Sequence, residues 1–155
     1  MDKPSYLNFD KSKYHWRPDV DYRANPEAYR VARRAGRPDL RAVQSWCPWR
    51  FKTPEIARAS SKAISKMFLA YLRQGDFVGA DMARKFLQMG FTRARRYANY
   101  KGGRKYDPAD KHQLEKGTGD PVKAESASIF YEAWQKAEAK PAYARMKAEW
   151  KEKLG

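Results

Sequence analysis

Apolar residues recur every three or four positions along two adjacent stretches of the chain, which is the spacing of one buried helix face. The first stretch follows Thr53-Pro54-Glu55 and ends at Gly75, and Asp76 begins the second. A side-chain oxygen followed by proline caps the start of a helix, and glycine commonly ends one. The pattern therefore predicts an αα-hairpin with helices over about 54–74 and 77–100. Its second helix turns small and apolar residues inward: Ala80, Ala83, Phe86, Leu87, Gly90, Ala94 and Ala98.

The same start signal occurs at Asn25-Pro26, Asp107-Pro108 and Asp120-Pro121, and more weakly at Lys140-Pro141. It predicts a short helix around residues 26–35, a short helix from Pro108 and two further C-terminal helices. Residues 1–50 show no sustained alternation and form a less regular, aromatic-rich region that we expect to pack on the rest. No repeat or long linker divides the chain, so the sequence predicts one mainly α domain over residues 1–155, a helical bundle around the hairpin.

Composition restricts the class of protein. Hydrophobic residues make up 42% of the chain and aromatic residues 14%, more than a disordered basic tail carries. No apolar run of about 18 residues and no signal-peptide pattern occurs, so we expect a cytoplasmic protein without a membrane partner. The single cysteine, Cys47, excludes a disulfide within the chain and is most simply a small packing residue.

Charge points to a polyanion. Lys and Arg number 33 against 18 Asp and Glu, a net charge of +15 that attracts phosphate groups. The excess is concentrated, because residues 82–106 hold eight basic and no acidic side chains, whereas residues 107–155 hold nine of each. An acid-free stretch of this length is not typical of a salt-bridged helix surface and indicates a binding face.

Helical angles place one polar, cationic stripe of the second helix opposite its apolar side: Lys85, Gln88, Thr92, Arg95, Arg96 and Asn99. Basic groups neutralise phosphates while aromatic rings stack on exposed bases, which is how proteins hold single strands and loops. By these angles Tyr97 belongs to the core and Tyr100 to its boundary. The candidate nucleic-acid-binding residues are Lys85, Arg93, Arg95, Arg96, Tyr100, Lys101, Arg104, Lys105 and Tyr106. The simpler alternative is a solvated helix face with core tyrosines, whose Gly102-Gly103 exit ends the helix while basic residues complement its dipole.

A secondary basic patch follows from one helical face that carries Arg30, Arg33, Arg34 and Arg37. This patch would extend the basic binding face of the second helix. Charged stems that cover neighbouring apolar area explain the pattern equally well.

No catalytic signal stands out. The two histidines, His15 and His112, lack a companion at the i+3 or i+4 spacing of metal ligands. Aspartate pairs at 19/21, 76/81 and 107/110 could hold Mg²⁺, but Asp76 and Asp107 are better explained as helix caps. The sequence therefore predicts no catalytic residue, no metal site and no cofactor.

Two blocks carry a resemblance. Residues 49–58, from Trp49 to Arg58, and residues 75–99, from Gly75 to Asn99, resemble an uncharacterised family of bacteria and tailed phages, over about half the chain. That family is a domain of unknown function, so the resemblance implies no activity, cofactor or site. It implies that the hairpin belongs to the shared module and that the protein is of bacterial or phage origin.

The leading hypothesis is a non-enzymatic DNA- or RNA-binding protein that contacts phosphates through the basic helix face and the Gly-Gly loop. One alternative is a small Mg²⁺-dependent nuclease or nucleic-acid-processing enzyme. Another is a phage or bacterial protein-interaction factor that binds an acidic partner through the same face. The sequence carries no sign of an oligomeric state.

Overall fold

A computed structural model of the chain describes residues 17, 19–32, 51–100, 103, 106–107, 109–110, 112–113, 115, 117 and 119–154. These residues form five helices and no strand. The helices are α1 (Pro26–Ala32), α2 (Pro54–Arg73), α3 (Phe77–Asn99), α4 (Pro121–Glu138) and α5 (Pro141–Leu154). The prediction of a mainly α fold around an αα-hairpin is confirmed.

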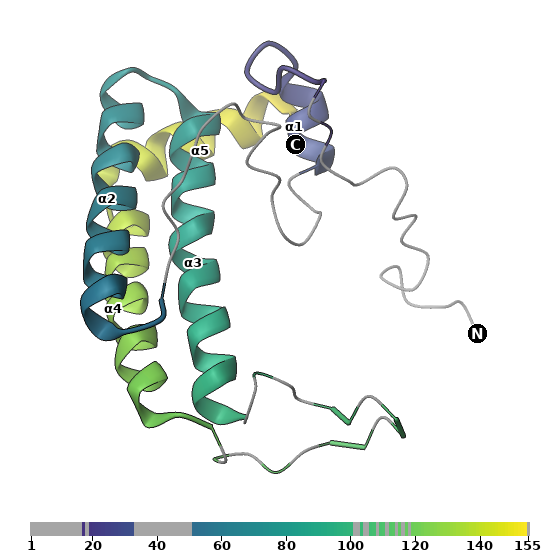
Figure 1. Ribbon diagram of the computed structural model, residues 1–155. Helices are drawn as coiled ribbons and strands as arrows, with labels where there is room; N and C mark the ends of the chain where they lie inside the picture. The colour runs from purple at the N-terminus through teal and green to yellow at the C-terminus, as the bar shows by residue number, and fades with distance from the viewer. Residues whose placement is uncertain are drawn as a thin grey trace.

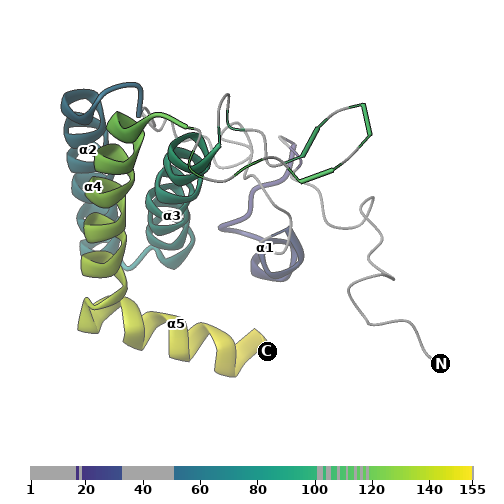
Figure 2. The same ribbon diagram turned by 90° about the horizontal axis from the view of Figure 1, so that it is seen from below.

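Helices α2, α3 and α4 lie side by side and form a three-helix bundle (Figures 1 and 2). The chain runs up α2, down α3 and up α4, so α2 and α4 are parallel and α3 is antiparallel to both. Helix α5 crosses the end of the bundle near the turn between α2 and α3, and α1 packs beside it. The N-terminal half of α3 is thus enclosed by more helices than its C-terminal half.

Local capping sets the ends of these helices. The Thr53 hydroxyl accepts from the Ile56 N–H at 3.2 Å, and the Asp76 carboxylate accepts from the Gly79 N–H at 2.9 Å. Between the two helices, Gly75 adopts a φ of 70°, a left-handed conformation that costs a residue with a Cβ. The predicted hairpin boundaries of 54–74 and 77–100 therefore agree with the structure to within one residue.

The predicted helix from Pro108 is wrong for the described residues that follow it. The Asp107 carboxylate accepts from the N–H groups of Ala109 and Asp110, at 2.7 and 3.4 Å. These bonds close a turn instead of a helix, and an isolated antiparallel bridge then joins Tyr106 to Gln113. The same capping chemistry serves either structure, since Asp satisfies free N–H groups in turns as well as at helix starts.

The predicted helix over residues 26–35 is observed as far as Ala32, and its last three positions lie outside the described residues. Two tyrosines of this region, Tyr22 and Tyr29, are 3% and 0% exposed and belong to the core. Both rings therefore pack in the core of the described residues.

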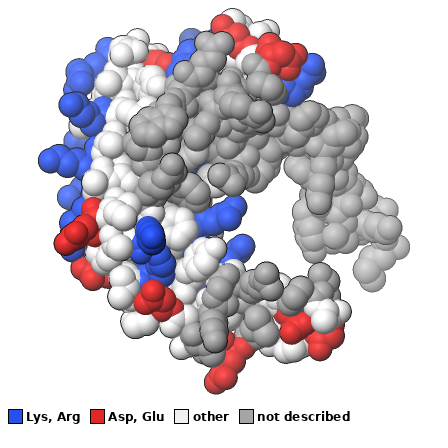
Figure 3. All heavy atoms as spheres, in the orientation of Figure 1, with Lys and Arg blue, Asp and Glu red and all other residues white. Residues whose placement is uncertain are grey.

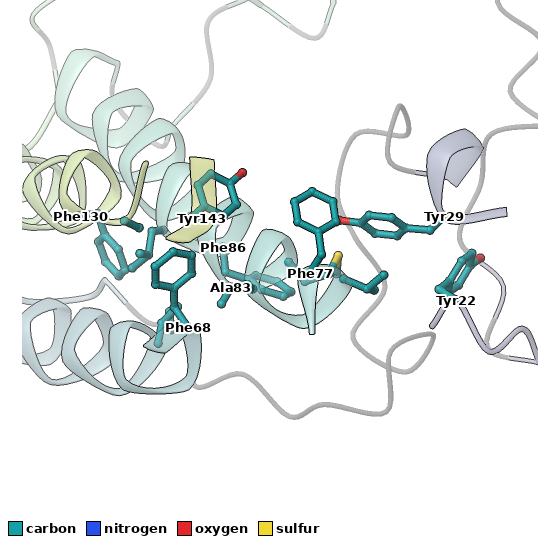
Figure 4. Packing of buried hydrophobic residues seen from close by; sticks show 14 of the residues in the cluster. Tyr22, Tyr29, Phe68, Phe77, Ala83, Phe86, Phe130 and Tyr143 are labelled. Carbon is teal, nitrogen blue, oxygen red and sulfur yellow. The ribbon is translucent and has the colours of Figure 1, made fainter. Parts of the chain in front are cut away.

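Buried aromatic rings make up much of the core. Figure 4 shows Phe68, Phe86, Phe130 and Tyr143 meeting between the helices, and Phe77 and Tyr29 extending this cluster toward α1. The rings of Phe68 and Tyr143 are 5.5 Å apart, and those of Phe77 and Tyr143 are 6.2 Å apart. Such ring pairs contribute beyond the area that they bury.

Gly90 does not interrupt α3, which runs unbroken to Asn99. A Cβ at Gly90 would lie 2.4 Å from Cδ1 of Phe130, a ring with no exposed surface. The glycine therefore makes room for α4 to approach α3 closely, and its cost in helix propensity is offset by that packing.

One carboxylate, that of Asp81 on α3, is buried with no exposed surface. The hydroxyl groups of Tyr29 on α1 and Tyr143 on α5 donate to its two oxygens, the second at 2.7 Å. Arg84 Nε, one helical turn along α3, donates to it at 3.1 Å. A buried charge is tolerated only when it is paired and hydrogen-bonded, and here three helices supply the partners.

The network continues through Arg84, which is itself only 7% exposed. Its guanidinium donates to Gln88 Oε1 at 2.7 Å and lies 3.6 Å from Glu138 Oε1 on α4. Trp134 Nε1 donates to the same Glu138 oxygen at 2.9 Å. This polar chain links α1, α3, α4 and α5.

Within the described residues, no helix is both long enough and apolar enough to cross a membrane.

Replacing Asp81 by alanine should lower the free energy of unfolding by about 3–5 kcal/mol, because Arg84 would stay buried without its closer counter-charge and would keep only the 3.6 Å pair with Glu138. Tyr143→Phe should cost less, about 1–3 kcal/mol, since it removes one donor from the carboxylate. Urea unfolding followed by circular dichroism measures both.

The matched control is Asp19→Ala, which removes an exposed carboxylate paired with Arg17 at 3.0 Å. Exposed pairs contribute about 0–1 kcal/mol, so this variant should unfold almost as the wild type does. An Asp81→Ala protein as stable as Asp19→Ala would contradict the structural role assigned to the carboxylate.

Candidate nucleic-acid interface

The C-terminal half of α3 has one face in the bundle and one in solvent. Leu87, Gly90 and Ala94 are buried, whereas Thr92, Arg95 and Arg96 are exposed. The helical repeat places these sets on opposite sides, as the sequence predicted. Further toward the N-terminus the prediction weakens, because Lys85 and Gln88 of the same stripe are half-buried.

Three arginines form the exposed basic face: Arg93, which is half-buried, and Arg95 and Arg96, which are exposed. None of the three makes an ion pair with another described residue. Guanidinium groups without a carboxylate partner can donate to phosphate oxygens in a two-pronged geometry. Figure 3 shows basic side chains reaching out from the α3 side of the bundle. This face is the described core of the candidate interface.

Arg84 belongs to the acid-free stretch but not to this face. It is held inside the protein by Asp81, Gln88 and Glu138. One of the eight cations in the acid-free stretch is therefore paired with an acid, Asp81, that lies one residue before the stretch begins.

The tyrosines are arranged differently from the prediction. Tyr97 was expected in the core but is 38% exposed, with one face packed on the Phe51 ring at 5.8 Å. Tyr100 was expected at the boundary and available for stacking, but it is only 7% exposed. The reason is that α3 ends at Asn99 and Tyr100 has an extended backbone, so the helical angle no longer describes it. Tyr106 is 52% exposed, as the stacking hypothesis requires.

The segment after α3 is closed onto the end of that helix. The Gly117 N–H donates to the Asn99 carbonyl at 2.6 Å, and the Asp120 N–H donates to the Tyr97 carbonyl at 3.1 Å. A Cβ at Gly119 would lie 2.2 Å from the same Tyr97 oxygen, so only glycine fits there. Between these anchors, the described parts of the segment reach away from the bundle (Figures 1 and 2).

Gly103 takes the left-handed conformation expected at the helix exit, with a φ of 71°, and packs against the Tyr97 ring. Three predicted contact residues of this loop, Lys101, Arg104 and Lys105, lie outside the described residues.

Of the secondary basic patch, the structure describes Arg30, which donates to Glu27 at 2.7 Å. The other three arginines of the patch, Arg33, Arg34 and Arg37, lie outside the described residues.

Asp107, Asp110 and His112 come together in the turn of this loop. Their ligand atoms lie within 4.8 Å of one another, the one such group of three in the described part of the chain. The N–H and the ring of His112 hold the pKa of the Asp110 carboxyl below its ordinary value. The three groups have the chemistry to contact a divalent cation. The sequence pattern did not single out His112, because it follows Asp110 at the spacing of a turn and not at the i+3 or i+4 spacing of helical metal ligands.

The other aspartate pairs have structural roles. Asp76 caps α3 and pairs with Arg23 at 2.7 Å, and Asp81 is the buried centre of the tyrosine network. Asp21 accepts from two backbone N–H groups of its own turn, and Asp19 pairs with Arg17. Neither pair offers two free carboxylates to a metal ion.

An aromatic cluster lies beside Arg95, between α3 and α4. The Phe91 ring is 5.1 Å from the ring of Tyr131 and 5.9 Å from that of Trp134. Tyr131 is 45% exposed. A shallow pocket of about 470 Å³ opens here and is lined by Phe91, Arg95, Ala127, Ser128, Tyr131 and Glu132. We call this cluster and its pocket the aromatic shelf.

A larger groove of about 670 Å³ lies on the other side of α4, between α2, α4 and the start of α5. Its apolar lining includes Phe68, Leu69, Ile129 and Ala133. Its basic lining residues are Arg58, Lys62, Lys136 and Lys140, against the single acid Glu132. Sequence reasoning missed both the groove and the shelf, because each combines residues from helices about 40 to 70 positions apart.

Comparison with known proteins adds the family and nothing on function. Neither a curated protein nor a solved structure matches the chain. The family model that does match covers residues 13–153, more than the half of the chain on which the resemblance rested. The chain therefore belongs to the family described as a domain of unknown function (DUF4385).

Proposed function

We propose that this protein is a non-enzymatic nucleic-acid-binding protein that contacts phosphate groups through the C-terminal half of α3. The observation that carries the proposal is the exposed basic face of Arg93, Arg95 and Arg96, which has no ion pair among the described residues. Unpaired cations on a protein of net charge +15 release counterions when they meet a phosphate backbone, and that release drives binding.

The surroundings of this face support the same proposal. The loop after α3 adds the exposed ring of Tyr106, and its far end is clamped to the end of α3 by the N–H groups of Gly117 and Asp120. Tyr100 takes no part, because its ring is buried. Contacts to phosphates give affinity without sequence specificity, so a sequence-independent binder is the expected class.

Replacing Arg95 and Arg96 by glutamine should weaken binding to duplex, single-stranded DNA and RNA alike. If six to eight phosphates are contacted, wild-type affinity should fall about 10³-fold or more between about 50 and 200 mM salt. The double variant should reduce the slope of log affinity against log salt by about 2 on duplex and about 1.4 on single strands, since each lost phosphate contact removes about 0.9 or about 0.7 respectively. Fluorescence anisotropy of labelled 20-mers measures the slope.

The control is Arg145→Gln with Lys151→Gln, which removes the same charge from exposed positions of α5. If the α3 face is the site, this control should retain most of the wild-type slope. Equal effects of the two double variants would mean that only net charge matters. Absence of binding to every probe at low salt would overturn the proposal.

The enzymatic alternative can be tested with the same purified protein. Asp107, Asp110 and His112 are the described groups on which a metal-dependent nuclease would depend. Nicking of plasmid in Mg²⁺ or Mn²⁺ that disappears in His112→Ala would replace the non-enzymatic proposal. An intact plasmid leaves binding as the activity to explain.

The second candidate function is docking of an acidic protein partner, and the α2–α4 groove favours it. An apolar floor with a basic rim matches an amphipathic helix that carries leucines on one face and carboxylates beside them. Lys62, Lys136 and Lys140 make no ion pair with another described residue, and Figure 3 shows cations gathered along the α2 edge. Along α2 the lining runs from Arg58 to Leu69, about three helical turns.

A synthetic peptide of about three turns, with leucines at i, i+3/i+4 and i+7 and glutamates between them, is the probe for this groove. Lys62→Glu with Lys136→Glu should weaken its binding at least tenfold, while the Arg95/Arg96 variant should bind it as the wild type does. A peptide of the same composition in scrambled order controls for charge. Equal loss in both double variants, or equal binding of both peptides, would contradict docking in the groove.

A further inference from the structure

We infer that the aromatic shelf between α3 and α4 binds an unstacked nucleobase, so that the protein prefers single strands of DNA or RNA to a duplex. The inference rests on the proposed function and adds that the protein recognises a base of the nucleic acid as well as its phosphates. It uses residues of α4, Tyr131 above all, that the basic stretch of the sequence does not contain.

The shelf presents aromatic surface to solvent. Tyr131 is 45% exposed, and it is held in place by neighbours instead of standing alone: its ring lies 5.1 Å from Phe91 and 5.9 Å, edge-on, from Trp134. Trp134 is fixed in turn by its hydrogen bond to Glu138. A ring that is already ordered loses little conformational freedom when a base stacks on it.

Small residues make the space beside the ring. Ala127 and Ser128, one turn before Tyr131 on α4, line the pocket of about 470 Å³, so no bulky side chain fills the hollow between Tyr131 and Arg95. A flat base can therefore enter along the ring. Any base can stack in this way, because each has a π-face.

The charges of the shelf orient a nucleotide. Arg95 lines it from the α3 side, next to the exposed Arg96, whereas Glu132 lines it on the α4 side. Phosphates are attracted to the arginines and repelled by the glutamate, so the backbone should follow α3 while the base points toward α4. A planar guanidinium can also stack on a base, which strengthens the same arrangement.

Strand preference follows from this geometry. In a duplex both faces of each base are covered by its neighbours, so no base face is free to stack on Tyr131. A single strand offers phosphates to Arg95 and Arg96 and a base to Tyr131 at once. The base is shared by DNA and RNA, and the two are distinguished by the probes.

The test uses the full chain and four labelled 20-mers: oligo(dT), oligo(rU), an abasic strand of the same phosphate count, and a mixed-sequence duplex. Wild-type protein should bind both single strands more tightly than the abasic strand. Tyr131→Ala should weaken binding to oligo(dT) or oligo(rU) about tenfold, as loss of one stacked base does, and change duplex affinity less than about twofold. Tyr131→Phe keeps the ring and should bind as the wild type does.

A second readout is independent of affinity. Stacking beside Trp134 should quench tryptophan fluorescence when oligo(dT) is added, and Trp134→Phe should remove that part of the quench. Circular dichroism checks that each variant is folded. A shelf that only packs α3 against α4 would lose stability in Tyr131→Ala but leave the ratio of single-strand to duplex affinity unchanged.

The outcomes separate the two proposals. If wild-type protein binds duplex, abasic and normal strands equally, and Tyr131→Ala does not alter that ratio, the nucleobase site is wrong and phosphate binding by α3 stands. If no probe binds at low salt, both proposals fall. A preference confined to oligo(dT) or to oligo(rU) assigns the shelf to DNA or to RNA.

Discussion

The buried carboxylate of Asp81 is the constraint on which the arrangement of this protein depends. A charge with no exposed surface needs partners, and those partners are the hydroxyl groups of Tyr29 and Tyr143 and the guanidinium of Arg84. Two of the three come from helices far away in the sequence. Helices α1 and α5 must therefore lie against the N-terminal half of α3 for the charge to be satisfied, and the aromatic core forms around that meeting point.

This constraint divides α3 into two halves with different roles. The first half, from Phe77 to Arg84, is buried on every side, and its arginine serves the interior. Of the described helices, α2 and α4 are the neighbours of the second half, and Arg95 and Arg96 there remain exposed. The basic surface is consequently smaller than the basic stretch of the sequence. It is placed at the end of the bundle where the loop after α3 folds back onto the helix.

Helix α4 separates two surfaces of different chemistry. Toward α3 it presents Tyr131 beside Arg95, and toward α2 it presents Ile129 and Lys136 above an apolar floor, with Glu132 at the boundary of both. The first combination suits a nucleotide and the second an acidic amphipathic helix. Because the two faces share no basic residue, replacing a cation on one face should leave the charges of the other face unchanged.

The sequence by itself determined what depends on neighbours along the chain. Thr53, Gly75 and Asp76 fix the hairpin boundaries because a cap bonds to N–H groups two or three residues away, and the alternation of apolar and basic residues along α3 follows from its helical repeat. Only the tertiary structure decided the roles of Asp81, Arg84 and Gly90. Their partners Tyr143, Glu138 and Phe130 lie about 40 to 60 residues away, and no local pattern encodes that pairing.

Two wrong predictions have the same origin: the burial of Tyr97 and Tyr100, which is the reverse of the expected one, and the helix expected after Asp107. Each depends on where the chain leaves a helix and on which residues it then contacts, as Gly103 contacts the Tyr97 ring. The aromatic shelf could not be predicted from the sequence for the same reason, since Phe91 and Tyr131 become neighbours only when α4 packs on α3. Local capping and periodicity thus set the helices, while long-range packing and the satisfaction of a buried charge set which residues face the solvent.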